Sequence, residues 1–220
     1  MGWMETSRSL DIWQAVALGC ITPSDGSGLG DENNHDKDVH VPAMAFLDAA
    51  TSLATLFDLL QGMQLARSAM VGNIQRIRKH FPADSETEPP RTLQQAMVAD
   101  SRPTKVVLKD QASVAHQLLW LSRVISFIEL IACAMEEDRD RTMAECVRLG
   151  YEQSLKPHHP IALQLTVSLL TKASPARDTF LQKFSDLDAD GALHAAKEMF
   201  QHIGVAHRAN KAFLAANGFS

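Results

Sequence analysis

The segment from Asp110 to Met135 constrains the fold most, because almost every face of the helix that it predicts is apolar. One apolar stripe follows helical spacing, and a second stripe lies beside it. The first comprises Val114, Leu118, Leu121, Ile125, Ile128, Ala132 and Met135, and the second comprises Trp120, Val124, Phe127 and Ile131. Arg123 and Glu129 interrupt the run of about 20 uncharged residues that a membrane span needs. The sequence therefore predicts a long helix buried in the middle of an α-helical sandwich.

The rest of the chain predicts helices as well. No stretch shows the alternation of a half-buried strand, and glycine and proline fall mainly between apolar periodic segments. Besides the central helix, we expect helices near residues 10–18, 42–60, 68–81, 91–100, 142–155, 161–173, 175–184 and 192–216. Ser174 is the expected N-cap of the helix over 175–184. The fold class is therefore all-α.

Two polar stretches separate these helices. "TPSDGSGLGDENNHDKDVH" follows the first helix and is too polar to bury an ordered core, and "PADSETEPP" breaks the chain later. We expect residues 1–40 to form a short helix and a flexible polar loop. Residues 41–220 are expected to form a single domain.

Composition excludes several classes of function. With a net charge of −5 and a pI near 6.0, the chain lacks the basic surface of a nucleic-acid-binding protein. Its three cysteines, Cys20, Cys133 and Cys146, have neither paired nor metal-type spacing. The amino-terminal residues do not resemble a secretory signal. We therefore expect a cytoplasmic protein with reduced thiols.

An acidic turn matches the first half of an EF-hand calcium loop. Asp186, Asp188, Asp190 and Gly191 fit that pattern, but the twelfth position, where calcium needs a bidentate glutamate, is Lys197. We predict no metal site here. The aspartates are instead expected to cap the last helix, where the helix dipole favours negative charge.

No catalytic arrangement is visible either. The nine histidines include no HExxH-type pair, and no glycine-rich strand-to-helix turn or nucleophile elbow is present. The sequence therefore indicates neither an enzyme nor a cofactor.

The segment "SAMVGNIQRIRKHF" combines helical periodicity with two residues that weaken a helix, Gly72 and Asn73. Such residues suggest either close packing or recognition. Ala69, Asn73 and Arg76 share one face of this helix, beside an apolar face. An amide and a planar guanidinium suit hydroxyls, amides or anionic oxygens. On the central helix, Trp120 offers a flat apolar face for a sugar ring or a cation, or simply packs in the core.

The order and spacing of five segments carry a resemblance to a known family. They are "FLDAATSLATLFDLL", "VGNIQRIR", "RTLQ", "LLWLSRVISFIELI" and "YEQSLKPHH". From about residue 43 to residue 184 the chain resembles the glycolipid transfer protein family. The resemblance implies a two-layer, all-α sandwich of about eight helices, with a surface head-group site above an internal hydrophobic lipid pocket.

The resemblance also implies roles for individual residues. Asn73 and Arg76 resemble the polar head-group contacts, with Arg76 standing where lysine is common. Trp120 resembles the residue that stacks on the first sugar, and His159 resembles the histidine that hydrogen-bonds the ceramide amide. His116 lies where phosphate-binding members tend to have arginine, and Trp120 also takes such a position. A tryptophan there favours a sugar over a phosphate.

Two positions depart from the family pattern. Ala69 stands where an aspartate usually accepts hydrogen bonds from the lipid, so acceptors and one negative charge beside Arg76 are missing. An anionic head group thereby becomes more plausible. Ile161 replaces a tryptophan that often docks on membranes, so membrane contact is weaker or made differently.

These residues support one leading hypothesis and two alternatives. The leading one is non-enzymatic binding and intermembrane transfer of a single glycolipid, with a glycosphingolipid as the expected ligand, by a protein that touches the membrane transiently. The alternatives are a carrier or sensor of an anionic sphingolipid, sulfated or phosphorylated, and a lipid-binding scaffold that does not transfer its ligand. Oligomeric state is open, with a monomer expected. The expected pocket residues are Phe57, Phe127, Ile131, Val167 and Leu170, each of which could also be ordinary core.

Overall fold

The computed structural model describes residues 1–20, 39–82, 91–100 and 102–219. Within these ranges the regular structure is helical, and Pro42 and Thr92 form an isolated β-bridge. The all-α prediction is therefore confirmed. The predicted polar loop over 22–40 and the break over 82–90 fall almost entirely outside the described residues.

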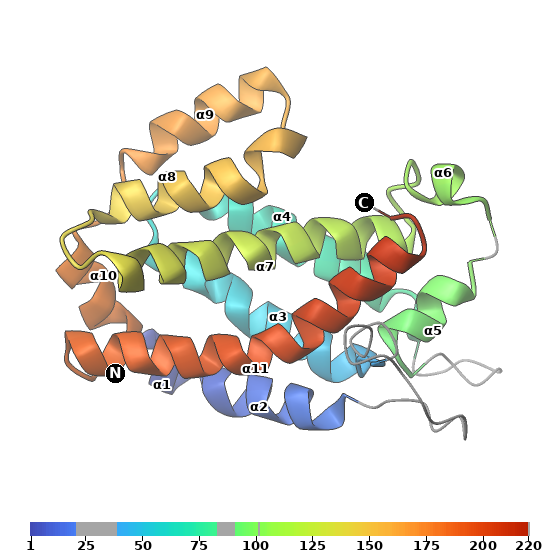
Figure 1. Ribbon diagram of the computed structural model, residues 1–220, viewed down its shortest axis with the longest axis horizontal. Helices are drawn as coiled ribbons and strands as arrows, with labels where there is room; N and C mark the ends of the chain where they lie inside the picture. Colours follow the sequence, from blue (N-terminus) through green and yellow to red (C-terminus); the bar gives the residue numbers. More distant parts are fainter. Residues whose placement is uncertain (21–38, 83–90, 101, 220) are drawn as a thin grey trace. The chain divides into compact units, whose positions relative to one another are not determined.

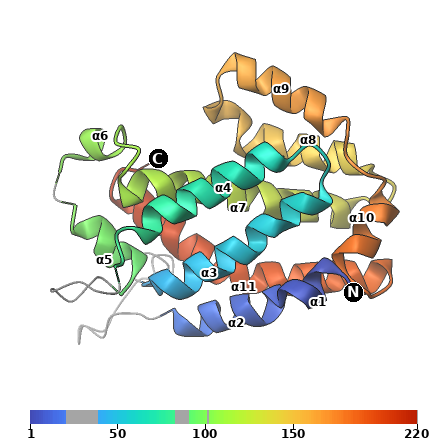
Figure 2. The same cartoon turned by 180° about the vertical axis from the view of Figure 1, so that it is seen from behind.

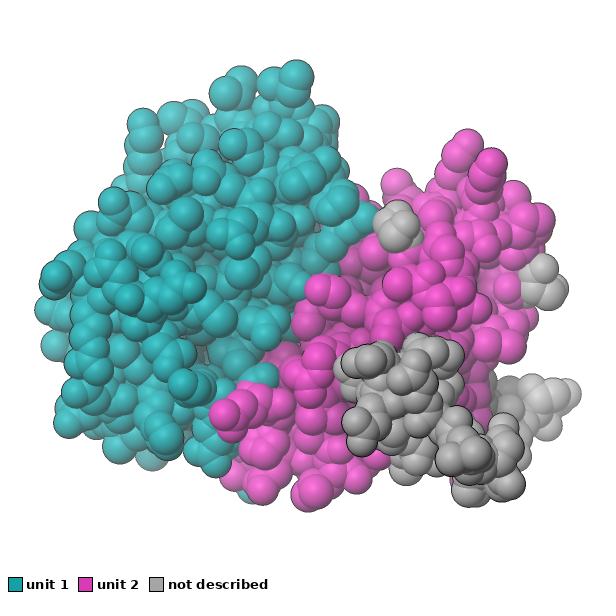
Figure 3. All heavy atoms as spheres, viewed as in Figure 1, with its two compact units in different colours: residues 1–10, 52–71, 123–200 teal, residues 11–51, 72–122, 201–220 magenta. Residues whose placement is uncertain are grey.

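The chain divides into two compact units, which Figure 3 colours separately. Unit 1 contains residues 1–10, 52–71 and 123–200, and unit 2 contains residues 11–51, 72–122 and 201–220. Several helices supply residues to both units: α2 (Ser9–Gly19), α3 (Ala43–Ala54), α4 (Gln64–Arg78), α7 (Val114–Glu137) and α11 (Ala189–Ala216). The predicted domain division at residue 41 stays a prediction.

The central helix α7 is buried, as its two apolar stripes predict. Leu118, Leu121 and Ile125 are fully buried, and Phe127 is nearly so. Among the described helices, α7 is the one long and apolar enough to cross a membrane, and more than half of its most apolar stretch is buried. Burial of this kind is typical of a core helix.

Unit 1 is organised around the second half of α7. Its other elements are α1 (Trp3–Ser7), the 3₁₀ helix η2 (Thr55–Leu59), α8 (Met143–Ser154), the 3₁₀ helix η3 (Lys156–His158), α9 (Ile161–Thr171) and α10 (Arg177–Phe184). Helices α8 and α9 form a hairpin that both views show (Figures 1 and 2). Gly150 of α8 faces α7 closely, because a methyl group there would lie 3.0 Å from the Phe127 carbonyl oxygen. The absence of a side chain thus lets α8 approach α7.

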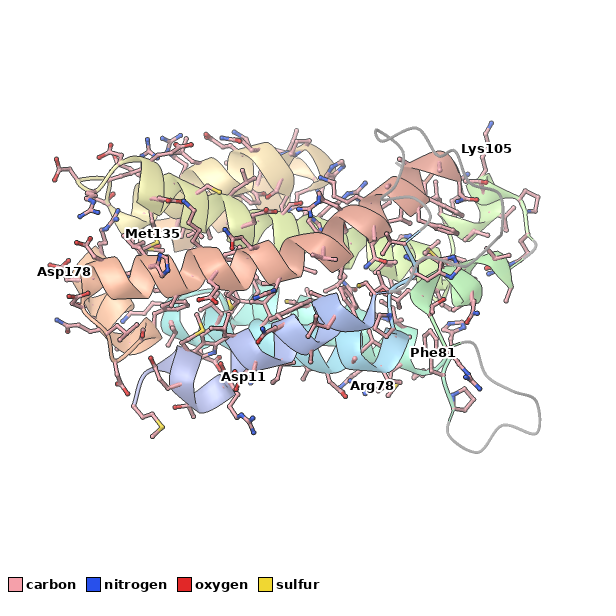
Figure 4. All side chains as sticks on the ribbon, turned by 60° about the horizontal axis from the view of Figure 1, so that its bottom comes forward. Asp11, Arg78, Phe81, Lys105, Met135 and Asp178 are labelled. Atoms are coloured by element: carbon pink, nitrogen blue, oxygen red, sulfur yellow. The ribbon has the colours of Figure 1, made fainter. Side chains whose placement is uncertain are left out.

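The end of α7 in unit 1 is held by two arginines. The Arg177 Nη2 donates to the Met135 carbonyl (2.6 Å) and its Nη1 to the Asp138 carbonyl (3.0 Å), while the Arg141 Nη1 donates to the Ala134 carbonyl (2.8 Å). Met135 and Asp178, the residue after Arg177, lie at the same end of unit 1 (Figure 4). The last carbonyls of a helix lack intrahelical partners, so these guanidinium groups supply the missing donors.

Unit 2 contains a buried polar network as well as apolar core. Its short helices are α5 (Leu93–Val98) and α6 (Thr104–Val107). The buried Gln94 side chain accepts from the Val41 amide (2.8 Å) and donates to Asn210 of α11 (3.0 Å). His207 of α11 is also buried, with its Nδ1 3.4 Å from the Ser122 hydroxyl. These hydrogen bonds join α11 to α5 and α7 within unit 2 because buried polar groups need partners.

Helix ends agree with the sequence in some places and differ in others; the helix expected over 68–81, for example, spans Gln64–Arg78. Capping boxes begin α5, at Thr92 and Gln95, and α8, at Thr142 and Glu145. The predicted Ser174 cap is wrong: α10 begins at Arg177 after Ala176, whose backbone is extended (ψ 146°) and whose side chain makes no cap hydrogen bond. The helix predicted over 42–60 ends at Ala54 and continues as the 3₁₀ helix η2.

The acidic turn before α11 caps this helix, as predicted. The Asp188 Oδ1 accepts from the Gly191 amide (2.8 Å), and Asp190 pairs with Arg139 (2.6 Å). In the described part of the chain, no group of three or more histidine, cysteine or acidic side chains is arranged to hold a metal ion.

Helix α4 explains why a glycine is tolerated at position 72. A methyl group on Gly72 would lie 3.4 Å from the Arg76 Nη1, so the guanidinium lies over the glycine one turn earlier. This separation is an ordinary van der Waals contact with a flexible side chain of the same helix, so the predicted close packing at Gly72 is not seen within unit 2. Arg78, labelled in Figure 4, pairs instead with Asp48 of α3 at 2.9 Å.

We expect the stability of the protein to fall in acid partly through His207. Burial, with Lys211 and Arg208 nearby, lowers the pKa of His207 to about 4. The unfolded chain takes up this proton near pH 6.5, whereas the folded protein does not, so stability present above pH 6.5 is lost as the pH falls toward 4. Urea unfolding at several pH values should show that the free energy of unfolding falls by about 3 kcal/mol over this pH range through His207. The variant His207→Gln should lack this part of the pH dependence. An unchanged pH dependence in the variant would contradict the assignment.

We expect Gly72→Ala to stabilise the protein by up to about 1 kcal/mol, because alanine favours a helix and the nearest group in unit 2 is a flexible arginine end. Chemical denaturation measures this change. The matched variant Gly150→Ala should destabilise the protein, since its methyl group would meet backbone at 3.0 Å. Destabilisation by Gly72→Ala would mean that rigid packing, rather than Arg76, occupies this space.

Candidate functional site

Unit 2 holds four of the predicted head-group residues. Asn73 and Arg76 lie one turn apart on α4, and His116 and Trp120 lie one turn apart on α7. Arg76 is exposed, whereas the other three are half-buried. Polar and aromatic groups that are only partly covered can reach a ligand while their helices stay packed.

A hydrogen bond joins the two helices that carry these residues. The His80 Nε2, just after α4, lies 2.9 Å from the carbonyl oxygen of Ala112, just before α7, and donates to it because a carbonyl only accepts. At 1.5 Å per residue, Arg76 and His116 each lie about 6 Å along their helices from this contact. Asn73 and Trp120 lie about 10 to 12 Å from it. The pair on α4 and the pair on α7 therefore each lie at a set distance along their helix from the His80–Ala112 hydrogen bond.

Arg76 differs from the other arginine at the end of α4. Arg78 is neutralised by Asp48, whereas Arg76 forms no ion pair with a carboxylate in the described ranges. Ala69, assigned to unit 1, is exposed and supplies no carboxylate. An exposed guanidinium without a carboxylate partner in the described ranges can bind the hydroxyl, carbonyl or anionic oxygens of a ligand.

His116 has a structural partner as well as a possible ligand role. Its Nδ1 lies 2.6 Å from the Leu108 carbonyl oxygen and donates to it, which ties α7 to the segment that follows α6. The buried Ser113 hydroxyl donates to the Val107 carbonyl nearby (2.8 Å). One ring nitrogen of His116 is therefore committed to the fold.

His159 belongs to unit 1, where three elements fix it. It closes the 3₁₀ helix η3, and its Nδ1 lies 3.1 Å from the hydroxyl of Tyr151 on α8. The Gln164 side chain of α9 donates to the His159 carbonyl (2.8 Å) and to the Lys156 carbonyl (3.0 Å). Burial, then the charges of His158 and Arg123, lowers the pKa of His159, so its imidazole is neutral at pH 7.

Arg123 is a further site candidate. It was not predicted from the sequence, where its charge was considered only as an interruption of the apolar helix. It is half-buried, and burial lowers the pKa of its guanidinium. Its charge also lowers the pKa values of His158 and His159, so the guanidinium and the two imidazoles lie within electrostatic reach of one another in unit 1. A charged residue kept on an otherwise apolar core helix was the signal available in the sequence.

The predicted pocket residues all belong to unit 1. Phe57 and Phe127 are buried and stack with their ring centroids 6.2 Å apart. Ile131 is buried beside Gly150, and Val167 and Leu170 are half-buried on α9. Leu170 covers Gly62, where a methyl group would lie 3.2 Å from its Cδ2. Their lining of a lipid pocket stays a prediction.

Comparisons with known proteins identify the family of this chain. A family model described as "Glycolipid transfer protein (GLTP)" matches residues 41–186. A glycolipid transfer protein of Aureobasidium melanogenum is 30% identical over 146 residues, which cover 64% of this chain and 67% of that protein. The crystal structure of HET-C2, a fungal glycolipid transfer protein, matches with a TM-score of 0.72 at 24% identity, covering 97% of this chain and 96% of the other.

Human ceramide-1-phosphate transfer protein, in complex with 12:0 ceramide-1-phosphate, matches with a TM-score of 0.76 at 16% identity, again covering 97% and 96% of the two chains. These two structures, both under 25% identical, establish the shared fold. The family match spans more than half of the chain. This chain therefore belongs to the glycolipid transfer protein family, whose members are lipid transfer proteins.

Proposed function

We propose that the protein binds one glycolipid, a glycosphingolipid, and transfers it between membranes without chemical change. Trp120 is the observation that carries the sugar assignment. Its side chain is half-buried although Leu118 and Leu121 beside it are fully buried, so part of its ring surface can stack on a sugar. Asn73 and Arg76 would contact the sugar hydroxyls with an amide and a fork of donors.

The ceramide amide is the proposed partner of His159. A neutral imidazole both donates and accepts, and the lowered pKa of His159 favours this neutral form at pH 7. A donor of this kind suits an uncharged carbonyl oxygen. The alkyl chains would be sheltered by Phe57, Phe127 and their apolar neighbours, at about 0.8 kcal/mol per buried methylene group.

A second candidate is a carrier or sensor of an anionic sphingolipid. Three observations favour it: the exposed Arg76 without a carboxylate partner in the described ranges, the alanine at position 69, and the half-buried Arg123 beside His158. Ceramide-1-phosphate is bound by a human protein with the same fold. Arginine recognises phosphate and sulfate well because its donors form a planar fork.

Transient membrane contact is assigned to α9. Ile161, Leu165 and Leu169 recur every fourth residue and are 64% to 75% exposed, so they form one apolar stripe. The helix itself carries no charged residue, and Lys156 and Lys172 flank its ends. An uncharged helix with basic flanks suits the boundary between acyl chains and anionic head groups. Contact with the inner leaflet of the cell membrane fits the proposed cytoplasmic location.

A lipid-binding scaffold that does not transfer its ligand is the third reading. It shares the head-group site and pocket with a transfer protein, and differs in whether the bound lipid leaves again at an acceptor membrane. Vesicle transfer kinetics separate the two, because a scaffold would extract lipid from donor vesicles without delivering it.

Transfer of fluorescent galactosylceramide between vesicles tests the head-group assignment. We expect Trp120→Ala to slow transfer by up to about tenfold, since a stacked ring contributes about 0.5 to 1.5 kcal/mol, while Trp120→Phe retains part of the rate. Arg76→Ala should slow transfer, and the matched variant Arg78→Ala, which loses only an ion pair with Asp48, should not. A normal rate for Trp120→Ala would exclude the sugar-stacking role. Faster transfer of sulfated galactosylceramide or ceramide-1-phosphate than of galactosylceramide would favour the anionic ligand.

Membrane contact is tested by replacing Ile161, Leu165 and Leu169 with serine together. Removing three exposed apolar side chains should lower partitioning onto phosphatidylserine-containing vesicles at least about tenfold, without loss of thermal stability. Leu18→Ser is the matched control, because Leu18 is 80% exposed on α2. Equal partitioning of the triple variant and the wild type would rule out α9 as the docking helix.

A further inference from the structure

The residues around His159 suggest how its ring is prepared for a ligand, and the inference rests on the proposed role of His159. Tyr151 lies on α8, is 5% exposed, and places its hydroxyl 3.1 Å from the His159 Nδ1. The two rings are tilted by 45° with centroids 5.6 Å apart, so the hydroxyl approaches the nitrogen in an ordered contact.

The direction of this hydrogen bond follows from the chemistry of the two groups. A phenol is a good donor, and an unprotonated imidazole nitrogen accepts more strongly than a phenol oxygen does. Burial raises the pKa of Tyr151, so its hydroxyl keeps its proton. The Tyr151 hydroxyl has no other hydrogen bond to a described side chain or backbone group, and the reverse direction would leave its proton unpaired. Tyr151 therefore donates to Nδ1, and in a neutral ring the proton then resides on Nε2.

The backbone that carries this ring is fixed separately. One side-chain amide, that of Gln164, donates to the His159 carbonyl at 2.8 Å and to the Lys156 carbonyl at 3.0 Å. The His159 amide also donates to the Lys156 carbonyl (3.2 Å). Gln164 thus binds carbonyls at the beginning of η3 and just after its end, and its hydrogen bonds connect η3 to the beginning of α9.

We propose that Tyr151 and Gln164 are positioning residues that prepare His159 for a lipid carbonyl group. Tyr151 selects the tautomer with the proton on Nε2, which can donate to the amide carbonyl oxygen of a ceramide. Gln164 fixes the backbone turn from which the ring projects. A ligand then meets a donor that is already oriented, so binding costs less ordering.

Nitrogen-15 NMR of the histidine rings tests the tautomer directly. The His159 signals are those missing from His159→Leu. In the wild type at pH 7 we expect an unprotonated Nδ1 and a protonated Nε2, and in Tyr151→Phe a shift of Nδ1 toward the protonated form. A wild-type ring with its proton on Nδ1 would overturn the proposal, whether or not lipid binds.

A double-mutant cycle tests whether both residues act through His159. Titration with short-chain galactosylceramide should show that Tyr151→Phe and Gln164→Glu each weaken binding about fivefold, the size of one hydrogen bond. Either change should have no further effect in His159→Leu. Gln153→Glu on α8 is the matched control, because Gln153 is exposed and hydrogen-bonds no described residue through its side chain.

The outcomes separate this proposal from the function on which it rests. Wild-type binding by His159→Leu would overturn the assigned role of His159. Loss of binding in His159→Leu, with normal binding by Tyr151→Phe and Gln164→Glu, would overturn only the positioning roles. If Tyr151→Phe and Gln164→Glu weaken binding equally in the wild type and in His159→Leu, the two residues act on the fold in general. That result would overturn the proposal as well. Thermal unfolding of each variant shows whether it is folded at the assay temperature.

Discussion

The burial of α7 is the constraint on which the other features depend. A helix with two neighbouring apolar stripes must be covered on most sides, and both compact units contain part of it. Its end in unit 1 is closed by Arg141 and Arg177, which supply donors to carbonyls that would otherwise be left without partners. Its beginning in unit 2 is fixed by the hydrogen bonds of His80 and His116. Each half of the helix thus has its own anchoring contacts within its unit.

Polar groups in this protein fall into two kinds. One kind is buried and holds helices together, such as Gln94, which bonds to Val41 and Asn210. The other kind is partly covered and borders the apolar core, such as Asn73 and His159. A carrier of an amphipathic lipid needs both, because the chains require a dry interior and the head group requires donors and acceptors near water. Nothing in such a function requires an activated nucleophile.

His159 stays neutral at pH 7 although the cationic Arg123 lies within electrostatic reach of it in unit 1. Burial and the neighbouring charges of His158 and Arg123 act in the same direction on its pKa. The same neighbourhood could interact with a phosphate or sulfate, and the neutral imidazole remains suited to an uncharged carbonyl. The proposed glycosphingolipid and its anionic alternative therefore differ in the use of Arg76 and Arg123, while the amide contact is common to both.

Hydrophobic periodicity and the order of the motifs were enough to predict the all-α class, the buried α7 and the family. Both signals are local or depend on spacing along the chain, as in the apolar positions Leu118, Leu121 and Ile125. The acidic turn that caps α11 at Asp188 was predictable for the same reason. Other features were decided by contacts between residues far apart or by competing local interactions. Helix α10 begins three residues after Ser174, and the nearest group to Gly72 in unit 2 is the guanidinium of Arg76. The side chains of Tyr151 and Gln164 both hydrogen-bond to His159. A periodic pattern does not predict which side chain hydrogen-bonds to which ring nitrogen or carbonyl. Those partners depend on how α8, η3 and α9 pack in three dimensions.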